Sequence, residues 1–501
     1  MTGASVAPSP PGTKLAAQVA RRIESGIIEA GWPVGELFGS ETELRTRYGV
    51  SRAVLREAVR IVEHHGVADM RRGPAGGLIV RAPDAAPSAR ALVIYLGHVR
   101  TTVPDVVYAR LLLEPLAAAL AARSITEEGI AALRASHAHE AAQPGMEIQD
   151  GLHALLGELS GNAAVALFVQ VLTLLTRHYA SAHAPGEQDA RQAKTDSARA
   201  HRAIVEATIA GDVALAEHRV AGHLRALGRW LGSGPPPSTA GRSSQPPNVG
   251  RGAQPPPPAG VAVAGPDAVH QKLAEIVADR IRTDIARAGL GVGELAGSEH
   301  DLVVRYGVSR AVLREAVRLL EYHSVAGMRR GPGGGLIVNR PDPSASVEAI
   351  ALYLEYQGID FDGLRIVRDA IELGCIERVV ARRADPRVAA RLWAAQQLTA
   401  STPADDLEAL SHAFHTELAE LTGNPVLALF QRILTVLSAR HLCATPSAAP
   451  RTGSPPPTEV MAAEVARVHG AIAEAVLAGD TGLAKHRMRR HLATLSTDWW
   501  H

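Results

Sequence analysis

The sequence predicts a mainly α-helical protein in which one unit, a small winged module followed by a helical bundle, is present twice. The stretch from Gly49 to Val80 recurs from Gly307 to Val338 with only six changes. Apolar residues recur at helical spacing over most of the chain, and aromatic residues make up only 4% of it, which favours helical packing over a β-sandwich. Residues 232–265, rich in Pro, Gly and Ser, separate the copies and predict an extended linker.

The winged module begins with two helices. The first is expected from Lys14 to Glu29, and its apolar face is formed by Leu15, Val19, Ile23 and Ile27. Gly31 and Pro33 end this helix. Ser40 and Glu43 have the spacing of an S-x-x-E capping box, which predicts a second short helix that continues to Tyr48.

The third helix of the module carries a ridge of arginines. Ser51 is an N-cap candidate because its hydroxyl can accept a hydrogen bond from a free backbone N–H. One face of the helix is apolar and comprises Val54, Leu55, Ala58, Val59 and Val62, and the other face carries Arg52, Arg56 and Arg60. Arg71, Arg72 and a glycine-rich bend precede the apolar strand 78–80. A helix with exposed arginines followed by a basic hairpin predicts a winged helix-turn-helix, which places the helix in the DNA major groove.

A string of helices follows each module. In the first copy they are expected at Val107–Arg123, from the cap Thr126, and near 148–159, 163–182, 190–210 and 213–230. Gly161-Asn162 and Gly211-Asp212 interrupt them, and Asp212 is expected to cap the last helix. The second copy repeats the pattern, with helices at Val269–Ala288 and Ser298–Tyr306 and a Pro-rich loop at Thr445–Pro457.

These patterns divide the chain into six segments and a short connection at Pro83–Ser88. The segments are a disordered arm at 1–12, a first winged domain at 13–82, a first bundle at 89–231, the linker at 232–265, a second winged domain at 266–340 and a second bundle at 345–501.

Composition excludes several classes of protein. The net charge is only +1, so a nucleic-acid surface must be a local basic patch. Two cysteines, Cys375 and Cys443, do not make a disulfide framework, and a reducing cytoplasm is expected. No apolar run approaches the roughly 18–20 residues of a membrane span, and the N-terminus does not resemble a signal peptide.

The winged motif resembles the GntR family of bacterial transcription regulators. The residues that carry the resemblance read S-E-x-E-L-x-x-x-Y-G-V-S-R-x-x-L-R-E-A-x-R-x-x-E, followed by R-R-G-P-x-G-G. The bundle resembles the FCD ligand-binding domain of the FadR-like subfamily, through R-x-x-x-E at Arg110 and Arg368, through His153 and His415 before a G-N pair, and through H-x21-H pairs near each end. Members usually carry one such unit and dimerise, whereas this chain fuses two.

The resemblance implies which residues contact operator DNA. They are Ser51, Arg52, Arg56, Ser309, Arg310 and Arg314 on the helices, and Arg72, Gly73, Arg330 and Gly331 at the wings. A guanidinium can bind guanine O6 and N7 with two hydrogen bonds, worth roughly 1–3 kcal/mol of discrimination. The alternative is that these arginines form an ordinary solvated face. Thr42 and His300 stand where the family often has arginine, so one contact is expected to differ.

Three histidines recur in each bundle: His153, His201 and His223 in the first copy, and His415, His469 and His491 in the second. By the resemblance they surround a divalent metal, together with an Asp four residues before the first histidine. Gln149 and Ser411 replace that Asp here. Asp150 and His412 lie three residues before the first histidine and are substitute ligands by hypothesis. Neutral imidazoles suit Zn or Ni, and a vestigial site without metal is the alternative.

The resemblance implies a repressor that is controlled by a small organic acid. Arg110 and Arg368 are candidates to bind the effector carboxylate, and a local salt bridge to the glutamate four residues later is the equal alternative. The expected protein is cytoplasmic, nucleoid-associated and not an enzyme, and it forms a pseudo-dimer within one chain, with a further homodimer left open. Two rivals are a metal-dependent enzyme that uses the triple-histidine sites and an architectural DNA-binding protein without an effector.

Overall fold

The protein forms two compact units in this computed structural model. The first spans Met1–Gly232 with Ser344–His501, and the second spans Ser233–Pro343. The residues described are 11–71, 73, 76–99, 101–142, 151–182, 187–232, 266–322, 324–329, 331, 334–340, 342–401, 407–444 and 458–497. None of the helices they form is long and apolar enough to cross a membrane. Residues 233–265 of the expected linker and the loop Thr445–Pro457 lie outside the described residues.

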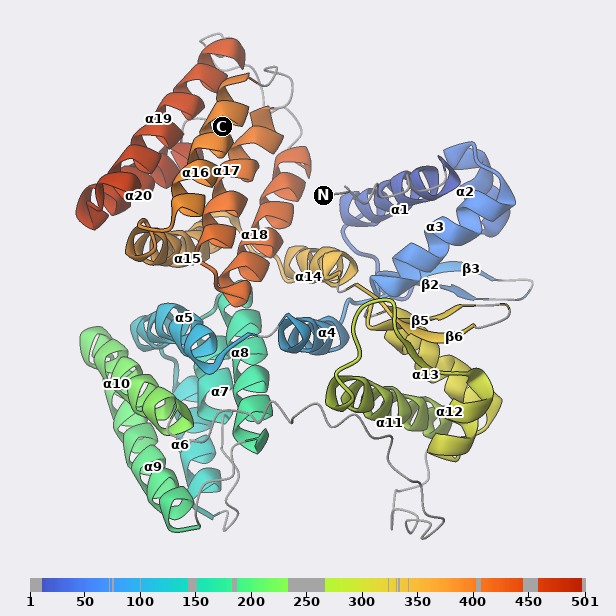
Figure 1. The fold of residues 1–501 in the computed structure, drawn as a ribbon, viewed down its shortest axis with the longest axis horizontal. Coiled ribbons are helices and arrows are strands. Elements are labelled where there is room, and N and C mark those ends of the chain that lie inside the picture. The colour runs from blue at the N-terminus through green and yellow to red at the C-terminus, as the bar shows by residue number, and fades with distance from the viewer. Residues whose placement is uncertain are drawn as a thin grey trace. The chain divides into compact units, whose positions relative to one another are not determined.

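The first winged module contains three helices and a three-stranded antiparallel sheet (Figure 1). Its elements are α1 (Pro11–Glu29), β1 (Leu37–Gly39), α2 (Glu41–Tyr48), α3 (Arg52–His64), β2 (Ala68–Arg71) and β3 (Gly77–Val80). The strand order is β1-β3-β2, and Met70 faces Leu78 while Leu37 faces Ile79. Apolar residues of α1, α2 and α3 pack against the sheet and form one core with Leu78 and Val80.

Three details of this module differ from the sequence expectation. Helix α1 begins at Pro11, inside the segment that was expected to be a disordered arm, and residues 1–10 are outside the described part. Leu15 was expected on the buried face but is 43% exposed, because Ala16 occupies that face. Strand β1 was not predicted, because three residues are too short to show a period. It pairs closely with β3: a Cβ on Gly77 would lie 2.7 Å from the Gly39 carbonyl oxygen, so glycine is required there.

The second winged module repeats the first. Its elements are α11 (Pro266–Arg287), β4 (Leu295–Gly297), α12 (Glu299–Tyr306), α13 (Arg310–Tyr322), β5 (Ala326–Arg329) and β6 (Gly335–Val338). The strand order is β4-β6-β5. The capping box predicted at Ser40 and Glu43 is confirmed in α2, and α12 has the corresponding box formed by Ser298 with Asp301.

Each bundle consists of seven described helices. The first contains α4 (Ala85–His98), α5 (Val103–Arg123), α6 (Glu127–Ala142), α7 (Gly151–Leu159), α8 (Ala163–Ala182), α9 (Glu187–Ile209) and α10 (Val213–Gly232). The second contains α14 (Ser344–Tyr356), α15 (Phe361–Ala381), α16 (Pro386–Ser401), α17 (Leu407–Leu421), α18 (Pro425–Ala444), α19 (Thr458–Ala478) and α20 (Thr481–Thr497). The connection expected at Pro83–Ser88 is shorter, because Asp84 caps α4 from Ala85 onward.

The two bundles share one hydrophobic core. Buried residues of α4, α5 and α8 form a single cluster with buried residues of α14, α15, α17 and α18. At its centre the rings of Phe168 and Phe430 stack with centroids 4.1 Å apart. Tyr108 donates a hydrogen bond of 2.9 Å to the Gly374 carbonyl. Figure 1 shows α5 and α8 adjoining α15 and α18 where the bundles meet.

Two asparagines join the bundles in the same way from opposite sides. Asn424 caps α18, because its Oδ1 accepts from Val426 N at 2.9 Å, and its Nδ2 donates to the Asp105 carbonyl of α5 at 3.0 Å. Asn162 caps α8 and donates to the Gly363 carbonyl of α15 at 2.8 Å. Each asparagine follows a left-handed glycine, so the G-N pair both starts a helix and bonds to the other bundle.

The first winged module also packs against the second bundle within the same unit. Leu352 of α14 belongs to the module's core, and the Trp32 and Tyr356 rings meet edge to face at 5.2 Å. Arg440 of α18 lies 2.9 Å from Glu355 and 3.9 Å from the buried Glu24 of α1. The first winged module is therefore attached to the bundle that follows the linker in sequence, through apolar and charged contacts.

We predict that Asn424→Ala lowers the free energy of unfolding by about 1–2 kcal/mol more than Asp480→Ala does. The substitution at Asn424 removes a helix cap and a bond between the bundles. Asp480 caps α20 through Leu483 N at 2.8 Å, so the control removes a cap alone. Urea unfolding of the full chain, followed by far-ultraviolet circular dichroism, measures the difference. Equal losses would show that the bond across the bundles contributes nothing.

Candidate DNA-binding surface and metal centres

Helix α3 presents arginines to solvent. Ser51 accepts from Val54 N at 3.3 Å, which confirms it as the cap. Leu55, Ala58, Val59 and Val62 are buried, so the opposite face turns outward. Arg52, with a side chain 65% exposed, contacts Glu41 at 2.6 Å. An exposed ion pair of this kind is worth roughly 0–1 kcal/mol, so the guanidinium remains available for a nucleic acid.

Helix α13 presents the same surface with a different ion pair. Ser309 accepts from Val312 N at 3.3 Å. Glu299 occupies the position of Glu41 but contacts Arg314, whose side chain is 68% exposed, at 3.2 Å. In the first module, the glutamate at the start of α2 pairs with Arg52, the first arginine of the ridge. In the second module, the glutamate at the start of α12 pairs with Arg314, the second arginine of the ridge. Thr42 and His300 follow these acidic residues, where the family often has arginine.

The wings are partly described. The β2–β3 and β5–β6 hairpins carry exposed Arg71 and Arg329 next to the bends. Gly73 has φ 121° and Gly331 has φ 104°, a conformation that other residues rarely adopt. The expected contact residues Arg72 and Arg330 lie outside the described residues.

In the first bundle, three buried histidines from three helices converge. His153 comes from α7, His201 from α9 and His223 from α10, and none is more than 8% exposed. The Nε2 atom of His223 lies 3.3 Å from that of His153 and 3.2 Å from that of His201. The sequence predicted these three residues as one set, and the structure brings their Nε2 atoms together.

The second bundle repeats the arrangement with His415 of α17, His469 of α19 and His491 of α20. The Nε2 atom of His491 lies 3.1 Å from that of His415 and 3.1 Å from that of His469. These rings are also buried. Histidines far apart in the sequence therefore form two matching centres.

The geometry fits a divalent metal. Two nitrogens that each bind one ion at about 2.1 Å are separated by roughly 3.0–3.4 Å at the angles usual in such sites. The observed Nε2 separations of 3.1–3.3 Å fall in this range. Burial, with neighbouring histidines, lowers the pKa of His491 to about 3 and lowers the pKa of His223 and of His469 well below the usual value. The rings of His223, His469 and His491 are therefore neutral, which is the form that binds metal.

The substitute ligands expected from the sequence do not complete either centre among the described residues. Asp150 lies outside them. His412 is half-buried, and it is not part of the cluster formed by His415, His469 and His491. Burial first, then the charges of Arg368 and His415, lower the pKa of His412 to about 4. The structure thus shows three-histidine centres, and it does not bring His412 to them.

A buried ion pair supports the first histidine of each centre. Arg110 Nε lies 2.5 Å from Glu114 Oε1, and Glu114 Oε2 lies 2.6 Å from His153 Nδ1. Burial by itself raises the pKa of Glu114, but the charges of Arg110 and His153 outweigh it and hold the pKa at about 2. The second bundle has the same series of contacts. Arg368 lies 3.0 Å from Glu372, which also contacts His415 Nδ1. The local salt bridge expected as one alternative for Arg110 and Arg368 is present in both copies.

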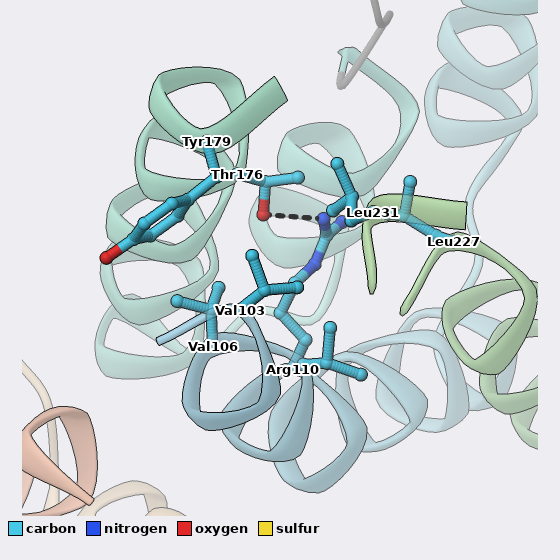
Figure 2. A pocket seen from close by; sticks show the side chains of 8 residues that line it. Val103, Val106, Arg110, Thr176, Tyr179, Leu227 and Leu231 are labelled. Carbon is cyan, nitrogen blue, oxygen red and sulfur yellow. Dashed lines mark hydrogen bonds between the residues drawn. The ribbon is translucent and has the colours of Figure 1, made fainter. Parts of the chain in front are cut away.

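Arg110 also faces a small cavity. Its Nη1 donates to Thr176 Oγ1 at 2.9 Å, as Figure 2 shows, and the residue is fully buried. The cavity measures about 10 Å³, which is the room of one water molecule. Its other walls are Val103, Val106, Val107, Tyr179, Leu227 and Leu231. A carboxylate can reach Arg110 only if these walls separate and the pair with Glu114 opens.

Sequence reasoning missed one residue of the first centre. Glu140 of α6 contacts His201 Nδ1 at 2.8 Å and 3.0 Å through its two oxygens. The two residues lie 61 positions apart, and no motif joins them. Glu114 and Glu372 were recognised as partners of arginine, but the contact of each with a histidine follows only from the packing of α5 on α7 and of α15 on α17.

We predict that Glu114→Gln destabilises the chain by about 3–5 kcal/mol, because it leaves Arg110 charged, buried and without its carboxylate. Glu206→Gln is the matched control: Glu206 pairs with Arg202 four residues earlier on an exposed helix face, and about 1 kcal/mol or less should be lost. Thermal and urea unfolding of the metal-free chains measures both. Similar small losses in the two variants would contradict the prediction.

Comparison with known proteins identifies both parts of each copy. The FCD domain family matches residues 105–226 and 364–494, and the family described as bacterial regulatory proteins, gntR family, matches residues 15–75 and 273–335. An Escherichia coli (strain K12) protein, named as a regulatory protein of an L-lactate dehydrogenase operon, is 30% identical over 234 residues, 45% of this chain and 86% of its own length.

Two further relatives also match less than half of this chain. The HTH-type transcriptional repressor NanR of Cronobacter sakazakii (strain ATCC BAA-894) is 24% identical over 239 residues, 46% of this chain and 86% of its own. The solved structure of Streptococcus agalactiae GntR shows 24% identity and a TM-score of 0.33 over 43% of this chain and 99% of its own. This chain belongs to the gntR family of bacterial regulatory proteins, and it carries the family's helix-turn-helix domain and an FCD domain twice, as a tandem duplication.

Proposed function

We propose that the chain is a sequence-specific transcriptional repressor whose two winged modules bind the two half-sites of one operator, under control of a small organic acid that binds in the bundles. One observation carries the DNA-binding part: each module presents a capped helix whose arginines are exposed and whose apolar face is buried. Membership of the gntR family supports it. The relative from Cronobacter sakazakii, named a repressor, supports the direction of regulation.

Base recognition is assigned to α3 and α13. Ser51, Arg52 and Arg56, with Ser309, Arg310 and Arg314, lie at the exposed start of these helices. A guanidinium there can reach guanine O6 and N7 in the major groove, and the wings, with Gly73 and Gly331 at their bends, contact the sugar-phosphate backbone. The modules differ at positions 69 and 327, which are Asp and Gly, so the operator is expected to be an imperfect palindrome.

The shared core of the two bundles supports the proposal that one chain takes the place of the dimer that single-unit relatives would form. Phe168 stacks on Phe430, and Asn162 and Asn424 each bond to the opposite bundle. We therefore assign operator binding to the monomeric chain in the cytoplasm, without a further homodimer. A second chain is not needed to supply the second half-site.

We also propose that each three-histidine centre holds a divalent metal, with Zn or Ni as the best match to imidazole ligands. The convergence of three buried Nε2 atoms in each bundle, with separations of 3.1–3.3 Å, supports this. The bound ion would supply a Lewis-acidic position for an oxygen of the effector. Glu114 and Glu372 hold the first histidine of each set in orientation, and Arg110 and Arg368 neutralise these glutamates.

The effector is assigned to the metal position and not to Arg110 itself. Arg110 is engaged by Glu114 and Thr176, and its cavity has room for one water molecule. A small carboxylate that binds the metal would alter the packing of helices which carry the histidines, and the shared core links these helices to the other bundle. The ligand changes DNA affinity only if it binds the two conformations of the bundles unequally.

The DNA proposal predicts that native protein enriches a motif of two half-sites from a random DNA pool at physiological salt. Arg52→Ala combined with Arg310→Ala should lose this motif, because each guanidinium contributes about 1–3 kcal/mol of base discrimination. Arg202→Ala, which removes an exposed arginine of a bundle helix, is the control and should keep the motif. Binding by native protein without any motif would favour an architectural protein.

The metal proposal predicts about two Zn²⁺ per chain and a higher melting temperature when Zn²⁺ is added to metal-free protein. At a free concentration of 100 Kd the gain is about 2.7 kcal/mol per site. His223→Ala with His491→Ala should abolish both effects. His218→Ala with His486→Ala, exposed positions on the same two helices, should leave them unchanged. A melting temperature that does not respond to Zn²⁺ would reject the proposal.

A further inference from the structure

We infer that the two metal centres are unequal, and that Glu140 makes the centre of the first bundle the tighter of the two. This rests on the proposed metal binding and goes beyond it, because it assigns a separate role to each copy. The observation behind it is a difference in the residues that support the histidines. Glu140 is a positioning residue, since it contacts a histidine and not the metal position.

In the first bundle, two of the three histidines have a carboxylate at Nδ1. Glu114 lies 2.6 Å from His153 Nδ1, and Glu140 lies 2.8 Å from His201 Nδ1. The Glu140 side chain is only 13% exposed, so solvent screens this contact little. A carboxylate at Nδ1 keeps the proton on that nitrogen, leaves the lone pair on Nε2 and makes Nε2 more basic. The hydrogen bonds from Glu140 orient the His201 ring, whereas Glu114 lies close to His153 Nδ1 without forming a hydrogen bond with it.

In the second bundle only one histidine has such a partner among the described residues. Glu372 contacts His415 Nδ1. The Nδ1 of His469 is buried, and no described residue forms a hydrogen bond with it. The His469 ring instead stacks on Phe414, with centroids 4.1 Å apart and planes 12° from parallel. When Nε2 of His469 binds a metal, its Nδ1 must carry a proton that this apolar surface does not accept.

The sequence of α16 explains why this helix supplies no such carboxylate to the second centre. Glu140 belongs to α6. The corresponding helix of the second copy is α16, and its residues include no Asp or Glu. The residue directly before the first histidine also differs: it is Leu152 in the first copy and Phe414 in the second. The larger aromatic side chain fills space against the second histidine of its set.

The test compares the centres one at a time in the full-length chain, with Zn²⁺ as the probe. His491→Ala leaves the first centre intact, and His223→Ala leaves the second intact. Calorimetric titration of metal-free protein in the presence of a competing chelator gives the Kd of each. The first centre is expected to bind at least about tenfold more tightly, which is the lower end of the effect of such supporting residues.

The role of Glu140 is tested in the His491→Ala background. Glu140→Gln is expected to weaken Zn²⁺ binding about 10–100-fold and to shift the visible spectrum of Co²⁺ bound at the same centre. The matched control is Glu128→Gln, an exposed glutamate on the same helix, which should change neither. Unfolding of the metal-free variants should be the same, which separates positioning of His201 from a loss of fold.

Each outcome has one meaning. If the unaltered chain binds no Zn²⁺, the metal proposal itself fails, and this inference fails with it. If both centres bind Zn²⁺ with the same Kd, or if Glu140→Gln and Glu128→Gln have the same effect, metal binding stands and the inequality is wrong. A tighter first centre that becomes similar to the second after Glu140→Gln supports the inference.

Discussion

The burial of apolar helix faces between the two bundles is the interaction on which the rest of the structure depends. Helices α5 and α8 of one copy and α15 and α18 of the other form one core, with Phe168 against Phe430 at its centre. Burial of apolar surface is the main favourable term in folding, but it is not directional and does not by itself set the orientation of the packed helices. The reciprocal hydrogen bonds of Asn162 and Asn424 fix how the two bundles are oriented, because each bond joins the start of a helix to a backbone carbonyl of the other copy.

Buried charge imposes a second constraint. A charged guanidinium inside a helical bundle is tolerated only when it is paired, and Arg110 and Arg368 each meet a glutamate four residues later. In both copies that glutamate also contacts the first histidine of the metal centre. The arginine therefore acts on the centre indirectly, by holding a negative charge in place where burial alone would neutralise it. This is why the Arg-x-x-x-Glu spacing shared by α5 and α15 serves both the structure and the candidate metal site.

The two copies differ in some of their buried contacts, because two units of one chain can carry different residues at corresponding positions. Glu24 of α1 is buried beside His65 and near Arg440 of the second bundle. The second winged module has Arg282 at the position of Glu24, so it does not repeat this set of charges. The metal centres differ in the same manner, through Glu140 on one side and Phe414 on the other. In a dimer of identical chains, each such change would occur on both sides.

The sequence by itself determined the features that depend on neighbours within a few positions. The helix periods, the caps Ser51 and Ser309, the capping boxes and the arginine ridges follow local rules, and the repeat exposed the duplication. The spacing of the histidines, read through the family resemblance, selected the three that converge in each bundle. Only the tertiary structure decided which distant groups meet. Strand β1, the contact of Glu140 with His201 and the stacking of Phe414 on His469 join residues without a common period, so packing alone brings them together.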